Sequence, residues 1–144
     1  MPHINLVFPF VPVSEFPNCV VRLKTALSEF PAFVLSLDDV SFFPQKRNKT
    51  ATYHLQPSIT SNIDSLFAVV SSALGTKNTK KFHAHMTLGQ CEMSEIQTVL
   101  TETQAWLGDG FDCVIDHVSL ISRDPNNRTD LFRVVDVVKL GGTN

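Results

Sequence analysis

The sequence predicts one mixed domain of helices and strands, of the α+β or α/β class, over residues 1–144. A chain of 144 residues is long enough to bury one substantial core and short for two. Hydrophobic residues at 43% and charged residues at 18% are typical of folded globular proteins. Three segments with helical spacing of apolar residues interleave with about seven strand-like runs, which favours a mixed fold.

The first half of the chain begins with an apolar run at 3–11, which predicts a buried strand closed by Pro12. Ser14 is a candidate cap for a helix that runs to about Phe30. Pro17 falls in the first turn of that helix, where proline is tolerated. Three shorter strands, the last two separated by a basic turn, are then predicted at 32–37, 40–44 and 51–56.

The second half begins with an amphipathic helix that Gly75 is expected to end, since glycine often follows a helix C-terminus. Apolar residues mark one face of this helix: Ile63, Leu66, Phe67, Val70 and Leu74. Ser94 and Gln97 have the spacing of a capping box for a third helix, which Gly108 would stop. Strands are predicted on either side of this helix, at 83–90, 111–122 and 131–139.

Charge and cysteine content argue against several classes of protein. A net charge of −2 disfavours a domain that coats nucleic acid, because such domains are strongly basic. The three cysteines form no CxxC pair, so neither a disulfide framework nor a zinc knuckle is indicated. The apolar N-terminus lacks a positive n-region, and no run approaches the ~20 apolar residues of a membrane span. We therefore expect a cytoplasmic protein with reduced thiols.

Six of the twelve basic residues lie in two short stretches of the chain. Two interpretations stay open for them. They could be ordinary solvated loops, or they could attract a small anionic substrate. The residues are Lys46, Arg47, Lys49, Lys77, Lys80 and Lys81.

Two short segments share the pattern histidine, apolar residue, small polar residue, apolar residue. The first is HINL at 3–6 and the second is HMTL at 85–88, each on a predicted strand that a predicted helix follows. Alternate side chains of a strand point to the same face and lie about 6–7 Å apart. His3 therefore projects with Asn5, and His85 with Thr87, while the apolar residues point toward the helices.

Two such strands facing one groove would suit the cleavage of a phosphate ester. One imidazole can act as base and the other as acid near pH 7, because the ordinary pKa of histidine is about 6.5. The amide of Asn5 and the hydroxyl of Thr87 could donate to the non-bridging oxygens. This chemistry needs no metal ion or cofactor. A single motif of this kind is more often a half-buried strand histidine, but two matching copies are less expected by chance.

The segments PHINLVFPF and FHAHMTLGQ resemble the paired H-x-[T/S]-x signatures of the 2H phosphoesterase superfamily, which includes 2′-5′ RNA ligase-like and cyclic nucleotide phosphodiesterase branches. The ending SLISR…FRVVDVVKLG is similar to the closing strands of that family. The resemblance implies an α+β fold of two lobes related by a pseudo-twofold axis, with antiparallel sheets, flanking helices and one motif per lobe. It also implies that His3 and His85 are the catalytic pair and that Thr87 binds phosphate.

Members of this superfamily open 2′,3′-cyclic phosphates or act on 2′-5′ linkages in RNA and related nucleotides. The resemblance thus implies a metal-independent phosphoric diester hydrolase whose partner is a nucleotide or an RNA end, with no membrane partner. The chain departs from the pattern twice. Asn5 stands where most members have Thr or Ser. The first motif begins at residue 3, without the strand and helix that usually precede it, so either that strand was lost, or the sequence is a fragment or has an alternative start. We expect an exposed sheet edge there, covered by dimerisation or by another element.

Two rival functions stay open. Asn5 and the short N-terminus favour a domain that binds a nucleotide or RNA without chemistry. His83 and His85 form an HxH that could chelate zinc in a metal-dependent hydrolase, although no carboxylate or cysteine follows at a telling distance. Other polar residues have these expected roles: His83 tunes the pocket or contacts substrate, His54 and His117 are structural, and Arg123 either reaches a phosphate or lies on the surface.

Overall fold

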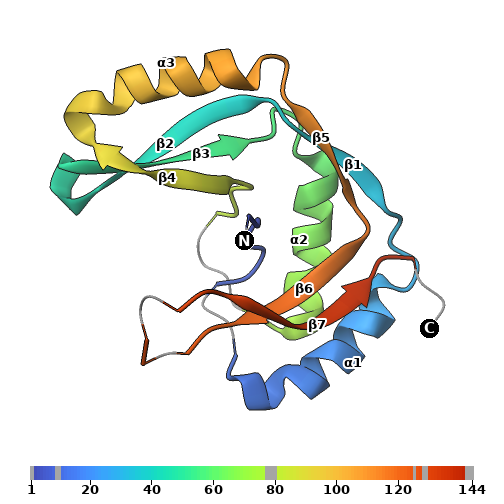
Figure 1. Ribbon diagram of the computed structural model, residues 1–144. Helices are drawn as coiled ribbons and strands as arrows, with labels where there is room; N and C mark the ends of the chain where they lie inside the picture. The colour runs from blue at the N-terminus through green and yellow to red at the C-terminus, as the bar shows by residue number, and fades with distance from the viewer. Residues whose placement is uncertain (1, 9–10, 77–80, 125, 128–129, 142–144) are drawn as a thin grey trace.

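The computed structural model of the chain shows two arms joined along one side, each built on antiparallel strands with a helix packed against them (Figure 1). The α+β class and the two-lobed arrangement are therefore confirmed. The structure describes residues 2–8, 11–76, 81–124, 126–127 and 130–141. Within these residues, no helix is both long and apolar enough to cross a membrane.

One arm is a three-stranded antiparallel sheet in the order β2-β3-β4. Helix α3 (Ile96–Leu107) lies along this sheet and buries its two end residues against the protein (Figure 1). A short 3-10 turn (Lys46–Asn48), whose three residues all have positive φ, joins the first two strands. The strands are β2 (Asp39–Gln45), β3 (Thr50–Gln56) and β4 (Met86–Glu92).

The other arm pairs β6 (His117–Ser122) with β7 (Arg133–Lys139). Helix α1 (Phe16–Leu27) packs against β7 and against α2 (Ser61–Leu74). Its buried residues recur at helical spacing, so one apolar stripe faces the core.

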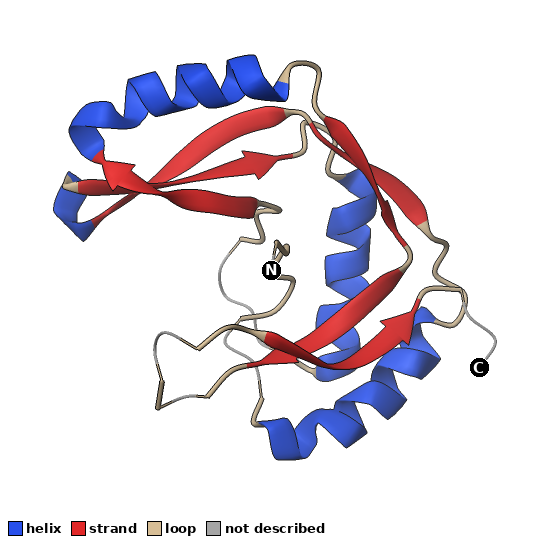
Figure 2. Cartoon of the chain, viewed as in Figure 1, coloured by secondary structure: helices blue, strands red, loops and turns tan. Residues whose placement is uncertain are grey.

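A two-stranded ribbon and helix α2 join the arms (Figure 2). The ribbon pairs β1 (Phe33–Leu37) with β5 (Phe111–Ile115) in antiparallel register. One hydrophobic core runs through both arms, since its fully buried residues come from helices and strands of each. The largest apolar side chains with almost no exposed surface in this core are Leu27, Leu37, Leu55, Leu66 and Val138.

The three helices lie where the periodicity predicts them, but two predicted caps are wrong. Ser14 and Ser94 fall inside 3-10 turns, at Val13–Glu15 and Met93–Glu95, and no side-chain cap bond starts α1 or α3. A cap side chain needs an extended backbone at the cap position, and here the chain enters each helix already in a helical conformation. Gly75, with φ 66°, ends α2 as predicted.

Helix α1 ends at Leu27, before the predicted Phe30, while Gly108 follows the end of α3 as predicted. The strands predicted at 32–37, 40–44, 51–56 and 131–139 are confirmed within about two residues at each end.

The single strand predicted at 111–122 is two strands that break at Asp116. The first half pairs with β1 and the second with β7, so the chain passes from one sheet to another at this residue. In the sequence only the polar pair Asp116-His117 marks this point, and a polar pair does not by itself indicate a change of partner.

The strand predicted at 3–11 is wrong over its described residues, because only Ile4 pairs, through an isolated bridge to Met86. Residues 9 and 10 lie outside the described part. A strand needs a neighbour that pairs with its backbone N–H and C=O groups. Toward β5 and β6, residues 2–8 instead face a cavity of about 580 Å³. The strand predicted at 83–90 begins only at Met86, so both of its histidines precede it.

Two glycines after α3 allow a controlled test of how the chain turns back into β5. Both have positive φ, but a Cβ at Gly110 would lie 2.6 Å from the Leu37 carbonyl oxygen, whereas a Cβ at Gly108 meets nothing within 4 Å. A positive φ strains alanine at both sites, at a cost on the order of 1–3 kcal/mol. We therefore expect Gly110→Ala to lower the free energy of unfolding more than Gly108→Ala, as measured by urea denaturation. Equal losses would show that the Leu37 contact is unimportant.

Candidate active site

The two histidine motifs meet at the antiparallel bridge between Ile4 and Met86. Both of these side chains pack against the hydrophobic core. Beyond this bridge no backbone pairing joins the two segments, since His3, Asn5 and His85 belong to no strand. The structure thus brings the two motif segments together from distant parts of the sequence.

Leu88 does not follow the predicted alternation, since 38% of its surface is exposed. The register between β3 and β4 shifts between Tyr53 and His54, so that Gly89 pairs with Tyr53 and Thr87 with His54. Leu88 is the extra residue of this bulge, and a bulge interrupts the alternation of faces.

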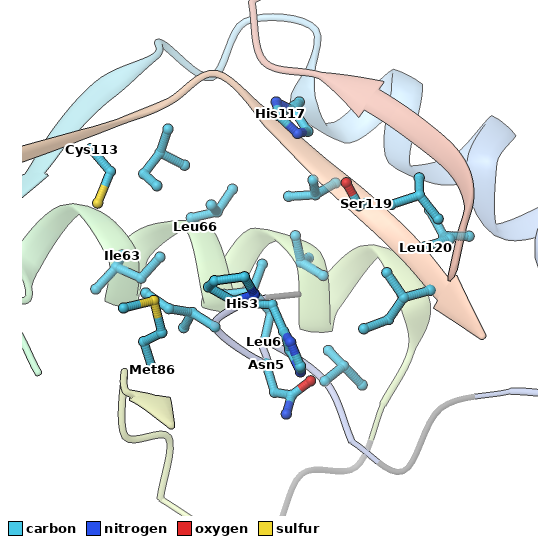
Figure 3. Close-up of a pocket in the computed structure, with 18 of the residues that line it drawn as sticks. His3, Asn5, Leu6, Ile63, Leu66, Met86, Cys113, His117, Ser119 and Leu120 are labelled. Atoms are coloured by element: carbon cyan, nitrogen blue, oxygen red, sulfur yellow. The ribbon is translucent and has the colours of Figure 1, made fainter. Parts of the chain in front are cut away.

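Two pockets lie beside the motifs. The larger, of about 580 Å³, is lined by His3 and Asn5, by apolar residues of α2 and by β5 and β6. Figure 3 shows its floor at Ile63 and Leu66 of α2 and its far wall at His117 and Ser119 of β6.

The smaller pocket, of about 320 Å³, is lined by His83, His85 and Lys81 together with aromatic residues. Asn5 and Leu6 line both pockets, so they lie between the space near His3 and the space near His85. Thr87 lines neither and is exposed.

The orientation of the half-buried His85 ring follows from one hydrogen bond. Its Nδ1 lies 2.7 Å from the carbonyl oxygen of His83. A carbonyl oxygen only accepts, so Nδ1 donates and carries the proton in the neutral ring. The lone pair then resides on Nε2, which is the atom that can take up or release a proton.

Behind His85 lies a buried cluster of rings that the sequence did not predict. His54 is fully buried, stacks on Phe43 at 4.3 Å between ring centroids, and lies 5.1 Å from the His85 ring. Burial lowers the pKa of His54, and the neighbouring His85 and His83 lower it further, against an opposing hydrogen bond to Gln56. His54 is therefore neutral at pH 7.

A chain of side-chain hydrogen bonds runs beside this cluster. Asp39 Oδ2 lies 2.6 Å from Gln56 Nε2, and Gln56 Oε1 lies 2.8 Å from His83 Nε2. His54 Nε2 is at the longer distance of 3.4 Å from the same oxygen. The one sequence signal for this grouping is that His54 and Gln56 are two apart on a predicted strand, and so share a face.

His3 has a different environment from His85. Its ring meets Phe132 edge-on at 5.6 Å between centroids, and the Arg123 guanidinium lies 4.8 Å from the centre of the same Phe132 ring. Stacking of this kind is a cation–π contact. The Phe132 ring thus lies between the Arg123 cation and the His3 ring. This position is compatible with both interpretations of Arg123, as a residue that reaches a phosphate and as a surface residue.

The remaining polar residues are dispersed. His117 is exposed and bonds its neighbour Asp116 at 2.5 Å, while also lining the larger pocket. In the described part of the chain, no group of three or more His, Cys, Asp or Glu side chains is arranged to hold a metal ion. Lys81 lines the smaller pocket, and the basic residues at 46–49 lie at the β2–β3 turn. Lys77 and Lys80 lie outside the described residues.

Comparison with known proteins gives a family and a fold. The model of the 2′-5′ RNA ligase superfamily matches residues 1–127. Solved structures with a similar fold include TT0787 of Thermus thermophilus, with a TM-score of 0.62 and 14% identity over 99% of this chain and 80% of that one. E. coli LigT complexed with 3′-AMP has a TM-score of 0.66 and 14% identity, covering 98% and 78%. No curated protein gives a significant match in sequence.

The burial of His54 predicts a dependence of stability on pH. The pKa of His54 is lowered from 6.5, so the unfolded chain takes up a proton that the folded protein resists. The free energy of unfolding should therefore fall as the pH drops below about 6.5. In His54→Phe, the difference in urea stability between about pH 7.5 and pH 5 should be smaller than in the wild type. An unchanged difference would contradict the burial of a neutral histidine here.

Proposed function

Because this chain belongs to the 2′-5′ RNA ligase superfamily, we propose that it is a metal-independent phosphodiesterase acting on 2′,3′-cyclic phosphates or 2′-5′ linkages of nucleotides or RNA ends. The family and the fold support a function of the phosphoesterase type. The LigT structures are complexes with 3′-AMP and with NADP+, which favours a nucleotide substrate for this chain as well. The observation on which the proposal rests most is the Ile4–Met86 bridge, which sets the two histidine motifs side by side.

In the proposed reaction, the two imidazoles act on opposite sides of one phosphorus atom. The neutral one removes a proton from the attacking water as the new P–O bond forms. The protonated one gives a proton to the ribose oxygen as the old P–O bond breaks. Because Nδ1 of His85 donates to the His83 carbonyl, its Nε2 is the atom that would act, as the base when the ring is neutral or as the acid when it is protonated. We propose that Asn5 and Thr87 donate to the non-bridging oxygens, where negative charge increases in the transition state.

A non-catalytic nucleotide- or RNA-binding domain of the same fold is the alternative, and Asn5 favours it because it replaces the usual hydroxyl residue. The two functions differ in whether the protein hydrolyses the nucleotide that it binds. Purified protein that binds a 2′,3′-cyclic nucleotide and leaves it intact would support the alternative. Hydrolysis to a ribose monophosphate would support the enzyme.

We expect His3→Ala and His85→Ala each to lower kcat/KM on a 2′,3′-cyclic nucleotide by at least ~10²-fold, the usual scale for a general acid or base. The pH profile of wild-type kcat/KM should be bell-shaped, since one ring must be neutral and the other protonated. Thr101→Ala, on the exposed surface of α3, is the matched control and should behave as wild type. Activity that a chelator removes, or a profile with one limb, would favour the metal-dependent alternative.

The role of Asn5 can be tested separately. Asn5 is exposed and lines both pockets, so Asn5→Ala should remove a donor and leave the fold intact. Loss of one preorganised donor costs ~3 kcal/mol in the transition state, or ~10²-fold in kcat. Asn5→Thr should restore much of this activity. If Asn5→Ala turns over as fast as the wild type, Asn5 has no part in the chemistry. If the wild type is inactive and Asn5→Thr is active, the chain has kept the fold and lost the reaction.

A further inference from the structure

Three side chains and one carbonyl form a continuous path from the start of β2 to the His85 ring. Asp39 accepts from the Gln56 amide nitrogen at 2.6 Å, and the Gln56 amide oxygen accepts from His83 Nε2 at 2.8 Å. The carbonyl oxygen of His83 then accepts from His85 Nδ1 at 2.7 Å. These residues come from β2, from β3 and from the segment before β4.

Asp39 sets the direction of the first two bonds in this path. A carboxylate oxygen accepts and does not donate, so the Gln56 amide must turn its NH2 group toward Asp39. Its oxygen is then turned toward His83, which in consequence must carry a proton on Nε2. The orientation of the Gln56 amide therefore selects the tautomer of His83. The second lone pair of the amide oxygen faces Nε2 of the buried His54.

His83 needs such a tether because residues 81–85 precede β4 and belong to no regular element. The His83 side chain is exposed. The carbonyl oxygen that accepts the hydrogen bond from His85 Nδ1 belongs to the same residue. Rotation of the peptide that follows His83 would turn this carbonyl away from His85. A free neutral imidazole then has no reason to keep its proton on Nδ1 rather than on Nε2.

We propose that Gln56, oriented by Asp39, is a positioning residue for His85 and acts through His83. This inference rests on the proposed function in assigning a catalytic role to His85, and it adds two residues to that site. Gln56 touches neither substrate nor reacting atoms; it fixes the His83 carbonyl and so keeps the His85 lone pair on Nε2. A small misplacement of a catalytic group can cost up to ~10²-fold in rate, which is the scale on which a positioning residue acts.

The direct test is the tautomer of His85, read from the ring 15N chemical shifts of protein labelled in histidine. In the wild type, the neutral His85 ring should carry its proton on Nδ1 and the His83 ring on Nε2. In Gln56→Leu, His85 should become a mixture of both tautomers. Gln90→Leu is the matched control, because Gln90 bonds only to Thr52 among the described contacts on the same sheet and should leave His85 unchanged.

The kinetic test separates action through His83 from a general effect on the sheet. Gln56→Leu should lower kcat about 10-fold with little change in KM. In a His83→Ala background, the same substitution should cost little more, since the tether is already lost. An unchanged His85 tautomer in Gln56→Leu would overturn the proposal, and so would an equal loss of kcat with and without the His83 ring. The 15N measurement needs no turnover, so an inactive protein would reject the proposed function while still deciding the role of Gln56.

Discussion

The candidate site depends on a single antiparallel bridge. Ile4 and Met86 pair with each other while both pack against the core, and no other residue of 2–8 pairs with a strand. Burial of these two apolar side chains stabilises the one backbone pairing between the motif segments. It is therefore what brings the two histidine motifs next to each other.

The two motifs are supported very unequally. The second motif continues into β4, which is paired along its length with β3. The buried His54 ring and the half-buried Phe43 ring lie behind it. The first motif has one bridged residue and lies against a cavity of about 580 Å³. We infer that His85 is held more rigidly than His3, since rigidity follows local packing and backbone pairing.

The rings around His85 affect the one among them that is buried. Three imidazoles, those of His54, His83 and His85, lie within 6 Å of one another by their centroids. Burial lowers the pKa of His54, and the neighbouring His85 and His83 lower it further. The structure therefore disfavours a charge on the ring that lies behind the second motif.

By itself the sequence determined the class of the fold, the position of the described helices, most strands and the presence of two matching histidine motifs, because periodicity and local spacing are properties of consecutive residues. It also determined that Gly75 ends α2, because a helix often ends in a residue with left-handed backbone conformation, which glycine adopts most easily. Only the tertiary structure decided that residues 3–8 pair at one position, that the chain changes sheets at Asp116, and that Asp39, Gln56 and His83 line up behind His85. These features depend on which strands become neighbours, and strand pairing is set by burial across the whole core rather than by the residues of any one segment.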